Sequence, residues 1–239
     1  MIEAEYESGI FGKLPAHGDF IHRSLTPEFI SIWDDWLQHY IAGSQEQIGD
    51  SWIDLYLTSP IWRFMLSEGC IDSNSWAGLM LPSVDKVGRY FPISILTKLP
   101  RNVCSLEFLL SNNEWLNEVE SITLNALETD LEVDELLNKI NKVGIFYNSI
   151  YSKQGVLSNS DPVVIKMDFE EQQPSSVSDY MLDTILQKSV SSYSAWSTQG
   201  SEHVSPSVFY SQGLPSINGI AGMLNGKWIW QEPFTINTA

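Results

Sequence analysis

Residues 76–96 read WAGLMLPSVDKVGRYFPISIL, and this stretch decides how the chain is arranged. Two apolar runs, residues 76–81 and 90–96, flank a polar insert, which predicts two strands joined by a loop. The loop carries a carboxylate, an ammonium group, a glycine and a guanidinium group. Charged side chains on a loop held by a rigid scaffold often carry function. The alternative is a plain hairpin turn in which Asp85 and Arg89 pair with each other.

The clearest helix is predicted for residues 26–42. Thr26 suits the N-cap, and Pro27 fits the first helical position because no backbone donor is needed there. Large apolar side chains then recur at spacings of three and four, which predicts one wide apolar face. Gly43 is predicted to end this helix, and a shorter helix is predicted for residues 45–58.

The other predicted elements complete an α+β domain. The strand at residues 61–66 and the two strands of the opening stretch predict an antiparallel meander packed under the two helices. We predict one domain over residues 1–239, with a mostly antiparallel sheet covered by helices. Its remaining elements are a strand at 10–14, helices at 106–127, 133–143 and 177–190, a surface excursion at 145–179 that encloses a strand at 163–167, and strands at 191–197 and 206–210.

The charge of the chain narrows the range of partners. The 239 residues include 13 Lys and Arg against 30 Asp and Glu, which gives a net charge of −17. Such a field repels phosphate backbones and anionic lipid, so we expect no nucleic acid partner and favour a basic protein. No apolar run approaches the ~18 residues of a membrane span, and residues 1–7 lack a signal-peptide pattern. The sequence therefore predicts a cytoplasmic protein without direct membrane insertion.

The sequence lacks the familiar catalytic motifs. Cys70 and Cys104 are too few for a disulfide framework or a zinc quartet. There is no Walker A loop or GxGxxG motif, and Ser83 has no GxSxG elbow around it. We therefore predict no enzyme, no catalytic or metal-binding residue and no cofactor. The alternative is a metal-dependent, phosphatase-like hydrolase in which His17 and two carboxylates, Asp19 and Asp85, meet in space.

A strongly acidic stretch follows the opening strands. Nine Asp and Glu residues, and no Lys or Arg, lie between Ser105 and Leu137. Like charges at this density are tolerated in helices when solvent surrounds them, which favours a solvated helix face. The alternative is a docking face for a basic partner.

Several blocks resemble one known family in the family's own order. The chain resembles the TagF/ImpM family of type VI secretion-associated proteins densely over residues 9–100 and thinly over 190–225, whereas residues 101–189 show no pattern that aligns. The matching blocks are GKLPAHGDF at 12–20 with Arg23, WDDWL at 33–37, SPIWRF at 59–64, PSVDKVGRYFP at 82–92, WSTQGS at 196–201 and GLP at 213–215.

The resemblance implies a function that composition and spacing do not reveal. It implies a cytoplasmic accessory protein that represses type VI secretion after translation by binding other proteins. The partners it implies are the forkhead-associated scaffold protein of the system and components of its inner-membrane complex. A further alternative is an adaptor that stabilises a secreted effector.

The two charged loops are the predicted site. We expect residues 12–23 and 83–89 to lie side by side and form one polar surface. Replacing Asp85 and Arg89 by Ala is expected to abolish repression in a protein that stays folded. The alternative is that the charges only lock the two loops together. The predicted partner contacts are Lys13, His17, Asp19, Arg23, Ser83, Asp85, Lys86 and Arg89.

Overall fold

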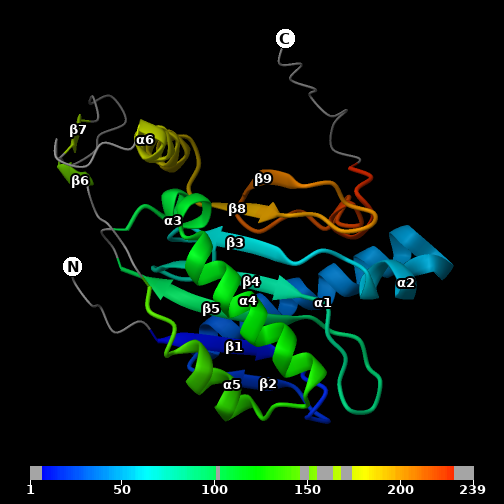
Figure 1. The fold of residues 1–239 in the computed structure, drawn as a ribbon. Helices are drawn as coiled ribbons and strands as arrows, with labels where there is room; N and C mark the ends of the chain where they lie inside the picture. Colours follow the sequence, from blue (N-terminus) through cyan, green and yellow to red (C-terminus); the bar gives the residue numbers. More distant parts are fainter. Residues whose placement is uncertain (1–6, 101–102, 146–150, 155–163, 168–173, 229–239) are drawn as a thin grey trace.

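The computed structural model describes residues 7–100, 103–145, 151–154, 164–167 and 174–228 (Figure 1). Seven of the described strands form one antiparallel sheet in the order β2-β1-β5-β4-β3-β8-β9. A separate small sheet pairs two further strands, β6 (Tyr151–Gln154) and β7 (Val164–Met167). The strands of the large sheet are β1 (Ser8–Gly12), β2 (Ile21–Arg23), β3 (Trp62–Leu66), β4 (Ser75–Leu81), β5 (Ile93–Leu99), β8 (Tyr193–Thr198) and β9 (Ser207–Gln212).

The predicted α+β class and the predicted meander are confirmed. The strands β3, β4 and β5 are neighbours and run antiparallel, with Leu79 opposite both Arg63 and Ile95. On the far side of β5, strand β1 pairs antiparallel so that Gly12 lies opposite Ile93. The ends of β1 and β5 therefore meet, and the loops that leave them begin side by side.

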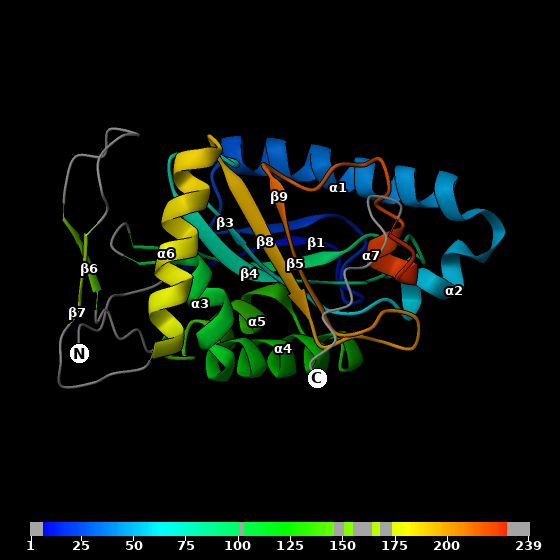
Figure 2. The same ribbon diagram turned by 90° about the horizontal axis from the view of Figure 1, so that it is seen from above.

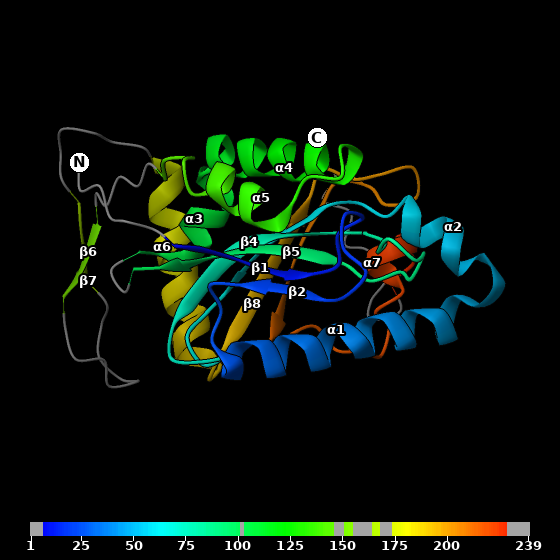
Figure 3. The same ribbon diagram turned by 90° about the horizontal axis from the view of Figure 1, so that it is seen from below.

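Helices cover both faces of the large sheet (Figures 1 and 3). Alternate residues of each central strand point to opposite faces, so Ile95 packs in one apolar cluster and Leu96 in the other. Helices α3, α4, α5 and α6 contribute to the first cluster, and α1, α2 and α7 contribute to the second. They are α1 (Pro27–Ile48), α2 (Trp52–Leu57), α3 (Ser105–Ser111), α4 (Asn113–Glu128), α5 (Val133–Ile140), α6 (Pro174–Ser189) and α7 (Gly222–Asn225), with a 3-10 turn at Gly49–Ser51.

The second cluster is rich in aromatic rings, and the indole N–H groups of its buried tryptophans are hydrogen-bonded. Trp33 of α1 lies 5.1 Å from Phe64 and 6.4 Å from Trp196, measured between ring centroids. Its buried indole Nε1 donates to the Ser94 hydroxyl at 3.1 Å. Trp62 likewise donates to a backbone carbonyl, that of Met223 in α7, at 3.0 Å. Large buried rings with bonded N–H groups stabilise a core strongly, so this face of the sheet is firmly held.

The start of α1 agrees with the prediction, but its end does not. The Thr26 hydroxyl accepts the Phe29 N–H at 3.2 Å, as an N-cap does. The helix then continues past Gly43 to Ile48 and is capped by Gly49, at φ 73°. A Cβ atom at Gly43 would lie 2.5 Å from the Ile217 side chain. Gly43 is therefore a point of close approach to the C-terminal segment, and its prediction as a helix end was wrong.

Two further predictions need correction. The helix predicted at 106–127 is split at Asn112, whose ψ of 44° is not helical, into α3 and α4. Ser and Asn side chains compete with the helical backbone for hydrogen bonds, and they cluster at 111–113. The second helix is shorter than predicted, because residues 45–48 belong to α1 and helix α2 begins only at Trp52.

The predicted excursion at 145–179 lies largely outside the described residues. Within it, the strand predicted at 163–167 is present as β7, and the helix predicted at 177–190 is present as α6. Among the described helices, none is both long and apolar enough to cross a lipid bilayer.

Glu107 of α3 lies in an unfavourable place for a charge. Its Oε2 atom is buried without a hydrogen-bond partner among the described residues. Burial, and next the nearby Asp179 carboxylate of α6, raise the pKa of Glu107 to about 7. An unfolded Glu has a pKa of roughly 4.3, so the folded state binds a proton that the unfolded state releases between these values. The free energy of unfolding therefore falls as the pH rises from about 4 to 7.

Replacing Glu107 by Gln is expected to stabilise the protein at pH 8 by about 1–2 kcal/mol and to change little at pH 4. This is less than the full pKa shift implies, because solvent partly screens the side chain. Urea unfolding at the two pH values measures the difference. Glu118→Gln, at an exposed position of α4, is the control and should show no such pH dependence. Equal effects of Glu107→Gln at both pH values would contradict this account.

Candidate functional site

Two loops meet at one end of the sheet. The first loop (residues 13–20) joins β1 to β2, and the second loop (residues 82–92) joins β4 to β5. They begin together because Gly12 lies opposite Ile93 in the β1–β5 pair. A Cβ atom at Gly12 would lie 2.0 Å from the Pro92 carbonyl oxygen, and the residue has a φ of 135°. Only glycine fits this close approach. The two loops therefore begin side by side, as expected, because the backbones of β1 and β5 lie in contact at this point.

Asp85 is the centre at which the two loops are joined. Its side chain is completely buried. One carboxylate oxygen, Oδ2, accepts from Lys13 Nζ at 2.9 Å and from Arg89 Nε at 2.6 Å. The other, Oδ1, accepts the backbone N–H groups of Val87 at 3.0 Å and Arg89 at 2.9 Å. The carboxylate therefore closes the second loop on itself and binds it to the first.

These contacts keep Asp85 ionised. Burial alone would raise the pKa of its carboxyl group. The hydrogen bonds from Lys13, from Arg89 and from the backbone N–H of Val87 outweigh burial and hold the pKa well below its ordinary range. A carboxylate with both oxygens occupied in this way has no capacity left for a metal ion or a substrate proton.

Further hydrogen bonds tie the loops through their backbones. The Lys86 N–H donates to the His17 carbonyl oxygen at 3.0 Å, and Arg89 Nη2 donates to the Gly18 carbonyl oxygen. The Ser83 hydroxyl donates to the Lys13 carbonyl oxygen at 2.8 Å.

A tyrosine from α2 anchors the second loop. The Tyr56 hydroxyl donates to the Ser83 carbonyl oxygen and accepts the Ser83 N–H, both at 3.0 Å. Burial raises the pKa of Tyr56, so the hydroxyl stays protonated and keeps its donor. This role of Tyr56 was not predictable from the sequence, because α2 is remote from the loop along the chain and Tyr56 fits the pattern of an apolar helix position.

The eight predicted contact residues divide into three groups. Lys13, Ser83 and Asp85 are buried, so we reassign them from partner contacts to the residues that hold the loops. Asp19, Lys86 and Arg89 are exposed. The remaining two, His17 and Arg23, are half-buried and face α5 and the turn before it.

Arg23 pairs with a residue outside the two loops. Its Nε atom donates to Asp134 of α5 at 2.6 Å. The His17 imidazole Nε2 lies 3.2 Å from the Glu132 carboxylate and 3.3 Å from the Val133 backbone nitrogen, which donates to it. Two residues of the acidic stretch thus contact the first loop and its continuation, although more than 100 residues separate them along the chain.

A third acidic residue, Glu120 of α4, binds a basic side chain of the sheet. Glu120 accepts two hydrogen bonds from the buried Arg63 guanidinium of β3, the shorter at 2.7 Å, and Asn117 accepts another at 2.7 Å. The acidic stretch was interpreted as a solvated helix face or as a docking face for a partner. Neither interpretation included these pairs, in which the stretch binds basic side chains of the sheet and of the first loop. Sequence spacing cannot reveal such pairs, because strands and helices distant in sequence bring them together.

The exposed part of the site is a mixed charged and apolar patch. We define the two-loop surface as the five exposed side chains of the two loops. Phe20 is 47% exposed, packs edge-on against Phe91 at 4.7 Å and lies 4.9 Å from the Lys13 ammonium group. Val87 at the loop tip is 68% exposed. Phe20 and Val87 were not among the predicted contact residues. Their position as apolar residues inside charged loops could have indicated them. The members are Asp19, Phe20, Lys86, Val87 and Arg89.

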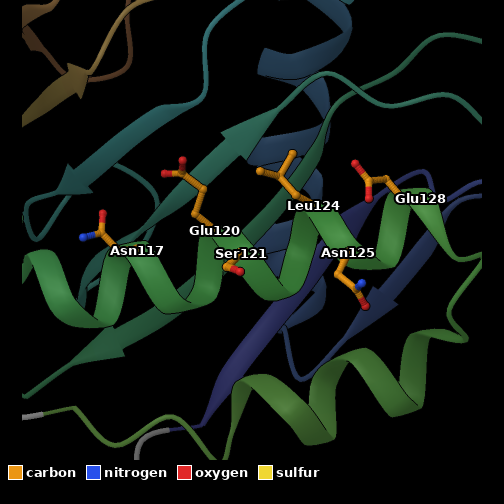
Figure 4. Close-up of a pocket in the computed structure, with 6 residues that line it drawn as sticks. All are labelled: Asn117, Glu120, Ser121, Leu124, Asn125 and Glu128. Carbon is orange, nitrogen blue, oxygen red and sulfur yellow. The ribbon is translucent and has the colours of Figure 1, made fainter.

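The outward face of α4 carries a shallow concavity of about 410 Å³ (Figure 4). Its described lining comes from this one helix and has no facing wall from a second described element, so it is an open surface rather than an enclosed substrate cavity. The lining residues are Asn117, Glu120, Ser121, Leu124, Asn125 and Glu128.

No metal cluster gathers from the described part of the chain, since no three His, Cys, Asp or Glu side chains there meet suitably. In particular, the alternative that joined His17, Asp19 and Asp85 lacks the required geometry. Asp85 is saturated by Lys13 and Arg89, and His17 turns toward Glu132.

Replacing Arg89 by Ala is expected to lower the free energy of unfolding by about 1–2 kcal/mol at pH 7, because a half-exposed charged hydrogen bond is lost. Because the pKa of Asp85 is lower in the folded than in the unfolded protein, the Arg89 hydrogen bond stabilises the fold fully above the unfolded pKa of about 3.9. This stabilisation is lost as acid protonates the carboxyl group of the folded protein. The difference between wild type and Arg89→Ala should therefore be constant from pH 7 to about pH 5 and shrink below about pH 4. Urea unfolding across this range tests it; a difference that persists unchanged into strong acid would contradict it.

The fold and the site define a class: an α+β domain with a rigid, charged loop surface at one end of an antiparallel sheet. The chain belongs to the family described as TagF N-terminal domain, type VI secretion system-associated, which matches residues 9–143. The resemblance inferred from the sequence is thereby confirmed. Both loops of the site lie within the matched residues.

A solved structure is similar to this chain over nearly its whole length. The crystal structure of PA0076 from Pseudomonas aeruginosa PAO1 is 29% identical in sequence, with a TM-score of 0.79. The similarity covers 95% of this chain and 98% of that chain. No curated protein matches the sequence.

Proposed function

We propose that this chain represses type VI secretion after translation by binding another protein through the two-loop surface. The observation that carries the proposal is the joined pair of loops, found within the matched family region. A buried carboxylate fixes the backbone of both loops, and exposed side chains of different chemistry project from that fixed backbone. Such preorganisation reduces the entropy lost on binding.

The composition of the surface suits protein recognition. Arg and aromatic residues are enriched at the energetic centres of interfaces, and Arg89 and Phe20 are of these types. Lys86 and Asp19 add charges of opposite sign, which favour a defined orientation of the partner. Catalysis would require a cavity and an unoccupied acid or base, whereas the buried carboxylate of the two loops, Asp85, accepts hydrogen bonds on both oxygens.

The partner is proposed from the family resemblance. The forkhead-associated scaffold protein of the secretion system is the first candidate, and components of the inner-membrane complex are the second. The net charge of −17 favours a partner, or a region of a partner, that is basic. The proposed action on these components requires a cytoplasmic protein, which is the localisation expected from the sequence.

A titration of protein level in a secretion-active bacterium tests the proposal. Raising the amount of wild-type chain should lower secretion in proportion, while the cellular levels of the secretion components stay unchanged. Unchanged secretion at high levels of the chain would contradict the repressor function.

Chemical cross-linking and affinity purification from the same cells distinguish repression from the adaptor alternative. A repressor should capture a structural component of the system. An adaptor should instead capture a secreted effector, and its removal should lower rather than raise secretion.

A further inference from the structure

The two edges of the large sheet differ in how they are protected. At one edge lies β2, which has only three residues, Ile21–Arg23, and whose Arg23 is bound to Asp134 of α5. Short edge strands and charged side chains prevent other strands from adding to a sheet. At the other edge lies β9, which has six residues, SVFYSQ at 207–212, with no charge, Pro or Gly. This edge is not protected in the same way.

β9 presents both backbone and apolar groups. It pairs with β8 on one side and is the last strand in the sheet order, so its other row of N–H and C=O groups has no strand partner among the described residues. Val208 is 63% exposed and Tyr210 is 65% exposed, and both point to the same face. Figure 2 looks down on this edge and shows β9 with no helix drawn across it.

The strand itself is firmly held from below. Phe209, between the two exposed residues, points to the opposite face and lies 5.4 Å from Trp62 and 5.1 Å from Trp228, measured between ring centroids. Each residue of β9 is paired in register with β8, from Ser207 opposite Thr198 to Gln212 opposite Tyr193. An edge held in this way is a template on which an extended segment can pair without reorganising the sheet.

We propose that β9 is a strand-addition site for an extended, basic segment of a partner protein. The open backbone row selects an extended chain, because only a strand matches alternating donors and acceptors. The exposed Val208 and Tyr210 select apolar side chains at alternate positions. The net charge of −17 repels a second copy of this chain and attracts Lys and Arg. The site is distinct from the two-loop surface. The two loops join β1 to β2 and β4 to β5, whereas β9 is the last strand at the other edge of the sheet.

The probe is the peptide Ac-Lys-Val-Thr-Val-Lys-Val-Thr-Val-Lys-NH2, mixed with the full-length chain. We expect backbone amides within 207–212 to become protected from hydrogen exchange. The same peptide N-methylated at every residue has equal charge but offers no N–H donor on either edge, so it cannot pair and should bind roughly tenfold more weakly or worse. A Glu-for-Lys peptide should also bind at least about tenfold more weakly. Tyr210→Ser, which removes an exposed apolar side chain without adding charge, should weaken binding of the basic peptide without unfolding the chain.

Three results would overturn the proposal. Equal binding of the N-methylated peptide would show charge attraction alone. Complete exchange protection of 207–212 in the free monomer would show that the chain itself covers β9. A dimer in sedimentation experiments that Tyr210→Ser dissociates would identify a second copy as the occupant. None of these results bears on the two-loop surface, so the proposed function is tested separately.

Discussion

Asp85→Ala is expected to lower the free energy of unfolding by about 3–5 kcal/mol at pH 7, the usual effect of removing one member of a buried charged pair. The substitution removes the acceptor for the Lys13 ammonium group, for Arg89 and for two backbone N–H groups. It also leaves Lys13 with only 5% of its side chain exposed and without its carboxylate. Urea unfolding followed by tryptophan fluorescence measures the change.

Two matched variants make this expectation specific. Asp19→Ala, in the first loop, removes a carboxylate that is fully exposed, and should leave the free energy of unfolding nearly unchanged. Lys13→Met combined with Asp85→Ala should lose less than the sum of the two single variants, because neither buried charge is then left unpaired. Strict additivity, or an Asp85→Ala protein as stable as wild type, would show that the buried pair does not hold the loops.

The loss of stability expected for Asp85→Ala changes what a variant at this position can test. The sequence placed Asp85 on an exposed loop tip, so that Asp85→Ala with Arg89→Ala was expected to remove function alone. Burial of Asp85 means that such a variant loses stability as well, and its phenotype cannot separate recognition from folding.

Val87→Asp is the variant that separates recognition from folding. The side chain is 68% exposed and only its backbone N–H contributes to the loop, by donating to Asp85. Stability should stay within about 0.5 kcal/mol of wild type, as is usual for exposed positions. Burying a new carboxylate in an interface is expected to weaken binding by about 2 kcal/mol, which is roughly 30-fold in the dissociation constant.

The matched control is Ile185→Asp. Ile185 is also an exposed apolar residue, at 55%, but lies on α6. It introduces the same charge at a place outside the two-loop surface. Ile185→Asp should repress secretion and capture the partner normally. If it did not, the effect of Val87→Asp would be explained by the added negative charge alone.

Much of the fold follows from local pattern. The meander β3–β4–β5 was predictable because long apolar runs bounded by turn residues identify strands, and the start of α1 was predictable because Thr26 and Pro27 form a recognisable N-terminus. The end of α1 was not, since Gly43 serves a contact with Ile217 that only the tertiary structure reveals.

The site was predictable in outline and not in detail. The charged blocks located both loops, and the resemblance located them within a family. Which residues are buried was not predictable, because Lys13 and Asp85 are of types that usually lie at the surface. The partners of Arg23 and His17 come from α5 and the turn before it, and no local spacing connects them.

The central claim is that the two-loop surface binds a component of the type VI secretion machinery and thereby represses it. The most direct measurement is quantitative capture of secretion components by tagged wild-type, Val87→Asp and Ile185→Asp chains from cross-linked cells, with secretion recorded in the same cultures. We predict that wild type and Ile185→Asp capture the same component and silence secretion, whereas folded Val87→Asp captures far less of it and leaves secretion active. Normal capture and normal silencing by Val87→Asp would contradict the claim.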